Sequence, residues 1–457
     1  MLIVHVVSEL SAKTDTHLLL ELACQPGRRD TWAVVGLRGG RSSDGVAESF
    51  ERCGVRVVGL SGLWAGTAGG LAGVLRVLGR GQRRVVLHTH LLRADLMGGL
   101  AGRALGWPVV STVYGYGAFR RARRRGCWDT ALDWIVRPLA DVRIAVAECV
   151  RADICRRISW PPQRCVTVYS GVDGVREAGA AAGVGAAARG LAREELLAVV
   201  RQAGVEVGDG ASVRLVVSLA RLDGQKGLES LVDAAGLLGE GWVVLVFGDG
   251  PLREALERRA VERGVGVGDR GSRERGRVVL AGFAAGAREW LCGADAFALP
   301  SRNEGTPMAL LEAWRAGVPA VVGDVGGMRE GPLRDAALRV APDRPAELAE
   351  ALRRVVEDAA LRRELVEQGY RRVGPGGRLH AGSTLRGYEA VYARLVGGEA
   401  GHSRGADGDG LVGAAGAARG PAVEGPAGGA GRERGGTRLG PVRVDRATVR
   451  RIIGTVI

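Results

Sequence analysis

Short apolar runs alternate with helical patterns along both halves of the chain, and this alternation constrains the fold more than any other feature. Helical spacing of apolar residues is clear in segments such as Ala94–Leu105 and Cys149–Ile158. The repeated β-α-β order predicts a parallel, doubly wound α/β sheet. The strands predicted for the first half are Leu2–Val7, Thr31–Gly36, Val55–Gly59, Val85–His88, Pro108–Val113, Val142–Ala147 and Cys165–Tyr169.

A Gly/Ala-rich stretch, Gly174–Gly190, separates this pattern from a second copy of it. The stretch has no usable periodicity and is typical of a linker. Because 457 residues exceed what one ordinary core organises, we expect a first domain over 1–170, a linker region over 171–211 and a second domain over 212–382. The strands predicted for the second domain are Val213–Leu219, Trp242–Phe247, Val278–Leu280, Ala296–Leu299 and Pro319–Val322.

The composition favours a protein without a membrane span or a disulfide framework. Seven cysteines, an odd number with no C-x-x-C pair, are more typical of reduced thiols in a cytosol than of disulfides or a zinc site. The apolar N-terminus, Met1–Val7, has no basic region ahead of it and is interpreted as a strand rather than a signal peptide. No apolar run reaches the roughly 20 residues that span a bilayer. We expect a cytoplasmic protein that is at most peripheral on the inner membrane face.

The net charge is +14, and the densest cluster of basic residues is a run beside Trp128 and Trp134. Basic residues next to aromatic ones suit an anionic membrane surface. Nucleic acid is not expected as a partner, because no known binding motif accompanies the charge. The residues of this run are Arg120, Arg121, Arg123, Arg124 and Arg125.

The end of the chain, 397–457, is rich in Gly, Ala and Arg and is interpreted as a disordered tail. It contains Asp407-Gly-Asp409, which has the form of a metal-binding D-x-D motif. No predicted strand lies beside this motif, so we expect no metal site there.

The segment from Ser301 to Glu312, which reads Ser-Arg-Asn-Glu-Gly-Thr-Pro-Met-Ala-Leu-Leu-Glu, carries the clearest chemistry. Thr306 is a good N-cap, Pro307 suits the first helical position and Gly317 supplies a stop. Two acids, Glu304 and Glu312, bracket the start of this helix. Since a helix N-terminus attracts anions, the arrangement suits a ligand that is part phosphate and part polyol.

Two other segments of the second half share the layout of strand, short loop and helix. One contains Arg221 and, five residues later, Lys226, which can meet the negative charge of a leaving diphosphate. The other is Phe247-Gly-Asp-Gly-Pro, with Gly248 and Gly250 in a tight turn. Ligands of such sheets bind outside the carboxyl ends of the strands.

Together these segments resemble the E-x7-E and R-x4-K elements of the retaining group one glycosyltransferases, a glycogen-synthase-like family with the GT-B fold. The resemblance implies two facing Rossmann-like domains with a cleft between them, and a closing helix over 383–396 that packs back on the first domain. It also implies catalytic roles for Arg221, Lys226 and Glu304. The implied donor-binding residues are Gly248, Gly250, Gly305, Thr306, Pro307, Met308 and Glu312, of which Glu312 would accept hydrogen bonds from the ribose hydroxyls.

The first half departs from this family at three points. The loop after the first strand has no Gly-Gly pair, and Lys13 is its cation. Tyr114-Gly115 stands where the family commonly has His-Gly, and Ser170 begins the Ser-Gly-Val-Asp that replaces Asn-Gly-Val-Asp. Lys13, His90 and Tyr114 are therefore the weaker candidates for the acceptor or sugar side of the site.

The resulting prediction is a metal-independent retaining glycosyltransferase with no cofactor other than its nucleoside-diphosphate-sugar co-substrate. The expected acceptor is a hydroxyl of a cell-surface polysaccharide or of a lipid-linked glycan. Two alternatives stay open: a catalytically weakened sugar-nucleotide-binding protein with an altered first domain, and a sugar-nucleotide epimerase on the same scaffold. An NAD-dependent dehydrogenase is not supported, because no strand is followed by G-x-G-x-x-G.

Overall fold

The computed structural model describes most of the chain up to residue 397. Lys13, the basic run Arg120–Arg125 and the tail with Asp407 and Asp409 lie outside the described residues. The described residues are 1–11, 14–38, 45–61, 67–115, 133–173, 185–207, 210, 212–266, 276–284 and 286–397, without the side chains of 14 and 15.

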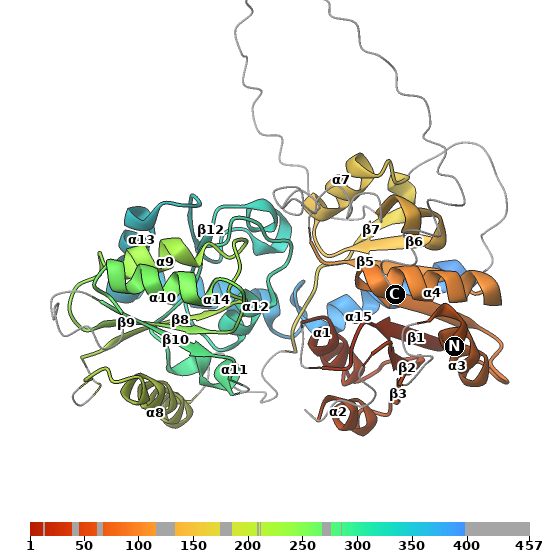
Figure 1. Ribbon diagram of the computed structural model, residues 1–457, viewed down its shortest axis with the longest axis horizontal. Helices are drawn as coiled ribbons and strands as arrows, with labels where there is room; N and C mark the ends of the chain where they lie inside the picture. Colours follow the sequence, from red (N-terminus) through yellow and green to blue (C-terminus); the bar gives the residue numbers. More distant parts are fainter. Residues whose placement is uncertain are drawn as a thin grey trace, which may run out of the picture. The chain divides into compact units, whose positions relative to one another are not determined.

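The first domain is built on a seven-stranded parallel sheet with the strand order β3-β2-β1-β4-β5-β6-β7 (Figure 1). Its strands are β1 (Leu2–Val7), β2 (Thr31–Gly36), β3 (Arg56–Gly59), β4 (Val85–His90), β5 (Val109–Val113), β6 (Val142–Ala145) and β7 (Cys165–Thr167). The helices are α1 (Thr14–Ala23), α2 (Val46–Arg52), α3 (Ala68–Leu78), α4 (Leu91–Leu105) and α7 (Glu148–Arg157), with the 3₁₀ turns η2 (Arg137–Leu139) and η3 (Pro162–Arg164).

The second domain repeats this plan on a six-stranded parallel sheet with the order β10-β9-β8-β11-β12-β13. Its strands are β8 (Arg214–Leu219), β9 (Trp242–Phe247), β10 (Arg277–Gly282), β11 (Ala296–Leu299), β12 (Ala320–Gly323) and β13 (Leu338–Val340). The helices are α8 (Ala186–Gln202), α9 (Leu228–Ala235), α10 (Arg253–Glu262), α11 (Ala287–Trp290), α12 (Met308–Arg315), α13 (Pro345–Glu357) and α14 (Ala359–Val373), with the 3₁₀ turns η4 (Leu291–Gly293), η5 (Gly326–Arg329) and η6 (Gly331–Leu333). The last described helix is α15 (Ala381–Val396).

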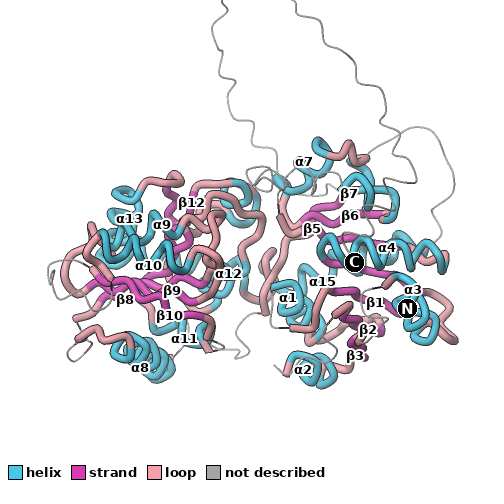
Figure 2. The backbone as a smooth tube through the Cα atoms, viewed as in Figure 1, coloured by secondary structure: helices cyan, strands magenta, loops and turns pink. Residues whose placement is uncertain are grey.

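Both sheets are covered by helices on two faces (Figure 2), and the side chains of each strand divide between the faces. In β1, Ile3 and Val7 pack in one hydrophobic cluster, whereas Leu2, Val4 and Val6 pack in another. This division follows from the two-residue period of a strand. The predicted α/β class with two Rossmann-like sheets is confirmed. In each sheet the strand order reverses once, between β1 and β4 and between β8 and β11, and such switch points are where ligands bind.

Helix α15 follows the second domain in sequence but lies against the first sheet (Figure 1). The Tyr392 hydroxyl lies 2.6 Å from Nδ1 of His88 on β4. The backbone before the helix also pairs with the chain that follows β7, since Val172 N donates to Leu379 O at 3.0 Å. Both Tyr388 and Tyr392 are almost completely buried, so α15 contributes to the core of the first domain.

Two sequence-based expectations need correction. The linker region expected over 171–211 contains α8, whose Leu196, Leu197 and Val200 are buried and which packs on η4. Its apolar face is diluted by small residues, which conceals the helical period. The expectation of reduced thiols is wrong for Cys24 and Cys53, which form a disulfide because the ends of α1 and α2 bring their Cα atoms to 5.1 Å. Among the described helices, none combines the length and apolar character needed to cross a membrane.

Candidate active site

The predicted site residues of the second domain follow the carboxyl ends of β8, β9 and β11, around the switch point of that sheet. Arg221 and Lys226 come after β8, Gly248 directly follows β9, and Glu304 follows β11. Neighbouring parallel strands end at the same edge, so segments far apart in sequence meet there.

Lys226 and Glu304 form a short charged contact at this edge. The Lys226 ammonium donates to Glu304 Oε1 at 2.6 Å, and the Ser301 hydroxyl donates to the same oxygen at 2.7 Å. The Glu304 side chain is 8% exposed and the Lys226 side chain 21% exposed. The structure therefore brings this predicted pair together as a largely buried, charge-assisted contact.

A pocket of about 670 Å³ adjoins this edge and contains other predicted residues. Arg221 reaches it with a largely exposed side chain whose Nε lies 2.9 Å from Asp223. The pocket combines two guanidinium groups, two carboxylates, a glycine turn and an exposed phenyl ring. Its lining consists of Leu91, Tyr114, Leu219, Ala220, Arg221, Phe247, Gly248, Asp249, Phe283, Ala284, Ala287, Arg288, Met308, Ala309 and Glu312. Lys226 and Glu304 are not part of this lining.

The glycine turn after β9 has no room for a side chain. A Cβ at Gly248 would lie 2.0 Å from the Ala220 carbonyl oxygen, and the residue has φ +137°. A Cβ at Gly250 would lie 2.4 Å from the Leu222 carbonyl oxygen. Both glycines therefore let this turn pack directly on the loop that carries Arg221.

Replacing Gly248 by alanine should distort the pocket and weaken nucleotide binding at least about tenfold, because both the dihedral angle and the close carbonyl oppose a Cβ. Gly282→Ala is the matched control, since Gly282 also has positive φ (+77°) but a Cβ added there would meet no atom within 4 Å. Calorimetric titration with nucleotide compares the two variants. Equal affinities in both would show that the turn does not shape the ligand site.

The start of α12 differs from the expectation. Pro307, not Thr306, is the N-cap residue, with φ −77° and ψ 111°. The Thr306 hydroxyl instead donates to the Val146 carbonyl of the first domain at 2.5 Å. Gly305, Thr306 and Pro307 are buried and do not line the pocket, whereas Met308 does. Gly317 follows the last helical turn with φ +69°, as expected for a helix stop.

Glu312 lies in α12 with only 2% of its surface exposed, and it lines the pocket. Its Oε1 is 3.1 Å from Nε of Arg288, without the geometry of a hydrogen bond. Burial raises the pKa of Glu312 to about 7, against the opposing effect of Arg288. Sequence reasoning missed Arg288, because it belongs to no motif and sits in the four-residue helix α11.

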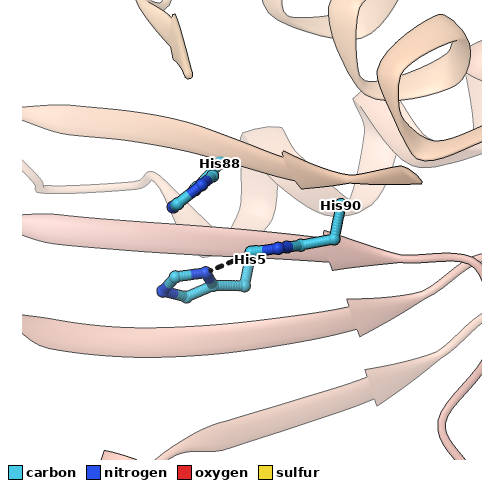
Figure 3. Close-up of side chains that lie close together, drawn as sticks. All are labelled: His5, His88 and His90. Atoms are coloured by element: carbon cyan, nitrogen blue, oxygen red, sulfur yellow. Dashed lines mark hydrogen bonds between the residues drawn. The ribbon is translucent and has the colours of Figure 1, made fainter. Parts of the chain in front are cut away.

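In the first domain, three buried histidines lie together at the β1–β4 switch point (Figure 3). His5 pairs in register with His88, and His90 follows two residues later on the same face. His5 Nδ1 is 3.0 Å from His90 Nε2, and both nitrogens of His88 contact hydroxyls, of Tyr392 at 2.6 Å and of Thr112 at 2.7 Å. His5 was not predicted, because it stands inside an apolar strand.

Among the described residues, His5, His88 and His90 are the group whose nitrogens are close enough together to hold a metal ion, within 4.8 Å of one another. Burial lowers the pKa of all three imidazoles, that of His90 to about 3, so they are neutral. Neutral imidazole is the form that binds metal. However, five of the six ring nitrogens already have hydrogen-bonding partners, and His5 Nε2 is the exception. The cluster therefore forms a hydrogen-bonded network of neutral imidazoles and hydroxyls.

The weaker first-domain candidates have different places. Tyr114 lines the pocket, and its hydroxyl lies 2.8 Å from His90 Nδ1. His90 is completely buried behind Tyr114 and does not line the pocket. The two are thus joined, but only Tyr114 borders the space available to a ligand.

Two family models match the chain. The model described as Glycosyltransferase Family 4 matches residues 28–176, in the first domain, and the model described as Glycosyl transferases group 1 matches residues 213–358, in the second. The two matches together cover more than half of the chain. The chain belongs to the group 1 glycosyltransferases.

Curated relatives are similar over part of their length. A glycosyltransferase of Methanocaldococcus jannaschii is 26% identical over 228 residues, which cover 49% of this chain and 53% of the relative. The UDP-Gal:alpha-D-GlcNAc-diphosphoundecaprenol alpha-1,3-galactosyltransferase of Escherichia coli is 25% identical over 258 residues, or 53% of this chain and 58% of the relative. The chain thus spans just over half the length of these two relatives.

Among solved structures, the HepE protein of Anabaena in complex with UDP and glucose matches with a TM-score of 0.66 and 16% identity. The match covers 86% of this chain and all of HepE. Sucrose-phosphate synthase of Thermosynechococcus elongatus matches with a TM-score of 0.63, 16% identity and coverage of 86% and 99%. At these identities the likeness concerns the fold, which is the GT-B fold that the motifs predicted.

Proposed function

We propose that the protein transfers a sugar, with retention of configuration, from a nucleoside-diphosphate sugar to a hydroxyl acceptor. The observation that carries this proposal is the convergence on one sheet edge of Arg221, the glycine turn at Gly248, the Lys226–Glu304 pair and Glu312. A nucleoside diphosphate needs cations for its phosphates and a carboxylate for its ribose hydroxyls. These residues supply both beside a single pocket.

In the proposed reaction the bond between the sugar and the diphosphate stretches first, and negative charge develops on the leaving phosphate. Arg221 and Lys226 stabilise that charge, since fixed cations act most strongly where charge appears in the transition state. The acceptor hydroxyl then attacks the oxocarbenium-like sugar from the face that the phosphate leaves, and the phosphate takes its proton. Glu304 contacts the transferred sugar. The proposal requires neither a protein nucleophile nor a metal ion.

The relatives guide the choice of ligand. The E. coli relative is named for a UDP-galactose donor and a diphosphoundecaprenol-linked acceptor, and HepE was solved with UDP. UDP is therefore the first nucleotide to test on this chain. The proposed acceptor is a polysaccharide or lipid-linked glycan at the inner membrane face, approached by the basic run Arg120–Arg125.

A second candidate is a binding protein that holds the donor without turning it over. It is favoured by one observation: the Tyr114 hydroxyl, at the position where the family commonly has histidine, is engaged by buried His90. A tyrosine hydroxyl in that contact is not a base at neutral pH. Turnover of a bound donor in the presence of acceptor would exclude this candidate.

Calorimetric titration of the full chain with UDP, GDP and ADP tests the donor site. One nucleotide should bind at micromolar concentration, and Glu312→Ala should weaken it at least about tenfold, because each lost hydrogen bond to a charged group costs about 1.5–3 kcal/mol. Glu350→Ala on α13 is the control, since this carboxylate is 64% exposed and outside the pocket. Absence of binding by all three nucleotides would contradict the proposed donor site.

A further inference from the structure

Glu312 is surrounded by charged groups from three helices. Arg288 and Glu289 face it from α11, Arg315 lies on its own helix α12, and Glu21 faces it from α1. His17, also on α1, lies 3.9 Å from Glu21 and is neutral, because burial lowers its pKa to about 3. The ionisation of Glu312 therefore depends on which of the two arginines compensates its charge.

The distances assign that task to Arg288. Its Nε lies 3.1 Å from Glu312 Oε1, whereas Arg315 Nη1 lies 3.3 Å from Glu21 Oε1 and is committed to that acid. The Glu312 side chain is 2% exposed, so water does little to support its charge. A charge buried to this extent needs a close counterion.

The contact with Arg288 leaves Glu312 free to accept a hydrogen bond at Oε1. Oε1 has no hydrogen-bonding partner among the described residues, although it has the charge of Arg288 beside it. An ionised carboxylate accepts hydrogen bonds through both oxygens, whereas a protonated one gives up part of this capacity. Two neighbouring ribose hydroxyls are donors that only the ionised form receives at full strength.

We propose that Arg288 is a positioning residue that keeps Glu312 charged, and thereby able to hold the ribose hydroxyls of a nucleotide, near neutral pH. The inference rests on the proposed function, because it assumes that a nucleoside diphosphate occupies the pocket that Arg288 and Glu312 both line. Arg288 acts through Glu312 and needs no contact with the ligand.

The proposal makes a signed prediction about pH. Burial raises the pKa of Glu312 to about 7 even though Arg288 opposes this shift. This pKa sets the pH at which the carboxylate ionises. Above this pH the nucleotide binds the charged form, and below it the affinity falls. Removal of the guanidinium moves the ionisation upward by about one pH unit or more. In Arg288→Gln, affinity at pH 7 should fall about fivefold or more and recover by pH 9.

Calorimetric titration with UDP, or with whichever nucleotide binds, at pH 6, 7, 8 and 9 measures these profiles. Arg288→Lys should restore most of the affinity at pH 7, because it keeps the positive charge. Glu312→Gln, with Arg288 intact, should bind weakly and without pH dependence between pH 7 and 9, where the terminal phosphate of the nucleotide is largely ionised. Arg258→Gln on α10, 68% exposed, is the matched control and should keep the wild-type profile.

The outcomes separate this inference from the proposed function. If the wild type binds the nucleotide and Arg288→Gln has an unshifted pH profile, Arg288 is not the group that controls Glu312. If Arg288→Gln is misfolded, the affinities of Arg288→Lys and Glu312→Gln test the inference instead. The inference is overturned if Glu312→Gln binds the nucleotide with the pH dependence of the wild type. If the wild type binds no nucleotide at any pH, the donor site itself is wrong and this inference falls with it.

Discussion

Replacing Lys226 by methionine should lower turnover of the donor sugar by about two to three orders of magnitude, the usual effect of removing one group that stabilises developing charge. The ammonium stands at the end of β8 and contacts Glu304 at 2.6 Å. An ammonium has three donors, so two remain for the oxygens of a phosphate. We expect the larger effect on kcat, because the leaving group carries more charge in the transition state than in the bound donor.

The identity of this residue adds to the expectation. Lys13 and Lys226 are the two lysines of a chain that otherwise uses arginine for its basic side chains. A compact point charge on a flexible stem fits beside Glu304 and Ser301, where a planar guanidinium would be larger. Lys226→Arg should therefore recover only part of the activity that Lys226→Met loses.

A double variant distinguishes catalysis from folding. Lys226→Met alone leaves the nearly buried Glu304 carboxylate without its cation, which destabilises a protein by several kcal/mol. Lys226→Met combined with Glu304→Gln removes both charges, and it should restore thermal stability but not activity. Recovery of turnover in the double variant would mean that Lys226 serves only to neutralise Glu304. Arg258→Met on the surface of α10 should retain wild-type turnover.

The two-domain fold could be predicted because its strands are buried on both faces and read as continuous apolar runs. Strand β13 was not predicted, because it has three residues and contains Arg339. The pattern of α8 was hidden by the alanines and glycine at its start, near Gly190. The disulfide between Cys24 and Cys53 could not be foreseen, because the ends of two helices bring these residues together across 29 positions of sequence.

The candidate site was predictable where its residues stand in local motifs, and not where contacts are long-range. Glu304 and Lys226 each follow a strand, and the strand order joins them. The prediction of Thr306 as the N-cap was wrong, because its hydroxyl donates to the Val146 carbonyl of the other domain. Arg288 carries no sequence signal, since its meaning depends on Glu312 lying beside it in space.

The protein should lose stability steeply between pH 6.5 and 5. His5, His88 and His90 are completely buried, and His17 is mostly buried. Their pKa values are lowered from 6.5, those of His17 and His90 to about 3, with burial as the main cause. Well above pH 6.5 these histidines are neutral in both states, and their contribution to stability is full. Below pH 6.5 the histidines bind protons in the unfolded chain but not in the folded protein. The free energy of unfolding therefore falls by about 1.4 kcal/mol per pH unit for each histidine.

Buried acids oppose this loss but do not cancel it. Burial raises the pKa of Glu312 from 4.5 to about 7, so the folded protein binds a proton there that the unfolded chain does not bind until lower pH. The pKa values of Glu21 and Asp95 are also raised by burial. With four histidines on one side, we expect a net loss of about 2–4 kcal/mol in the free energy of unfolding between pH 6.5 and 5.

Urea unfolding followed by circular dichroism at pH 7.5, 6.5, 5.5 and 5 measures this loss, and His5→Met assigns it. His5 is the suitable member of the cluster to replace, because one of its nitrogens already lacks a partner and methionine fills irregular apolar space. The variant should be less stable at neutral pH, since His90 loses its contact at Nε2, but its stability should fall by about 1–2 kcal/mol less on acidification. Above pH 7.5 the two proteins should show the same pH dependence, because the histidines are almost entirely neutral there in both states. If both proteins lost the same free energy of unfolding on acidification, His5 would be protonated within the folded protein. The buried histidine network would then contain a positive charge, which would contradict the proposed neutral state.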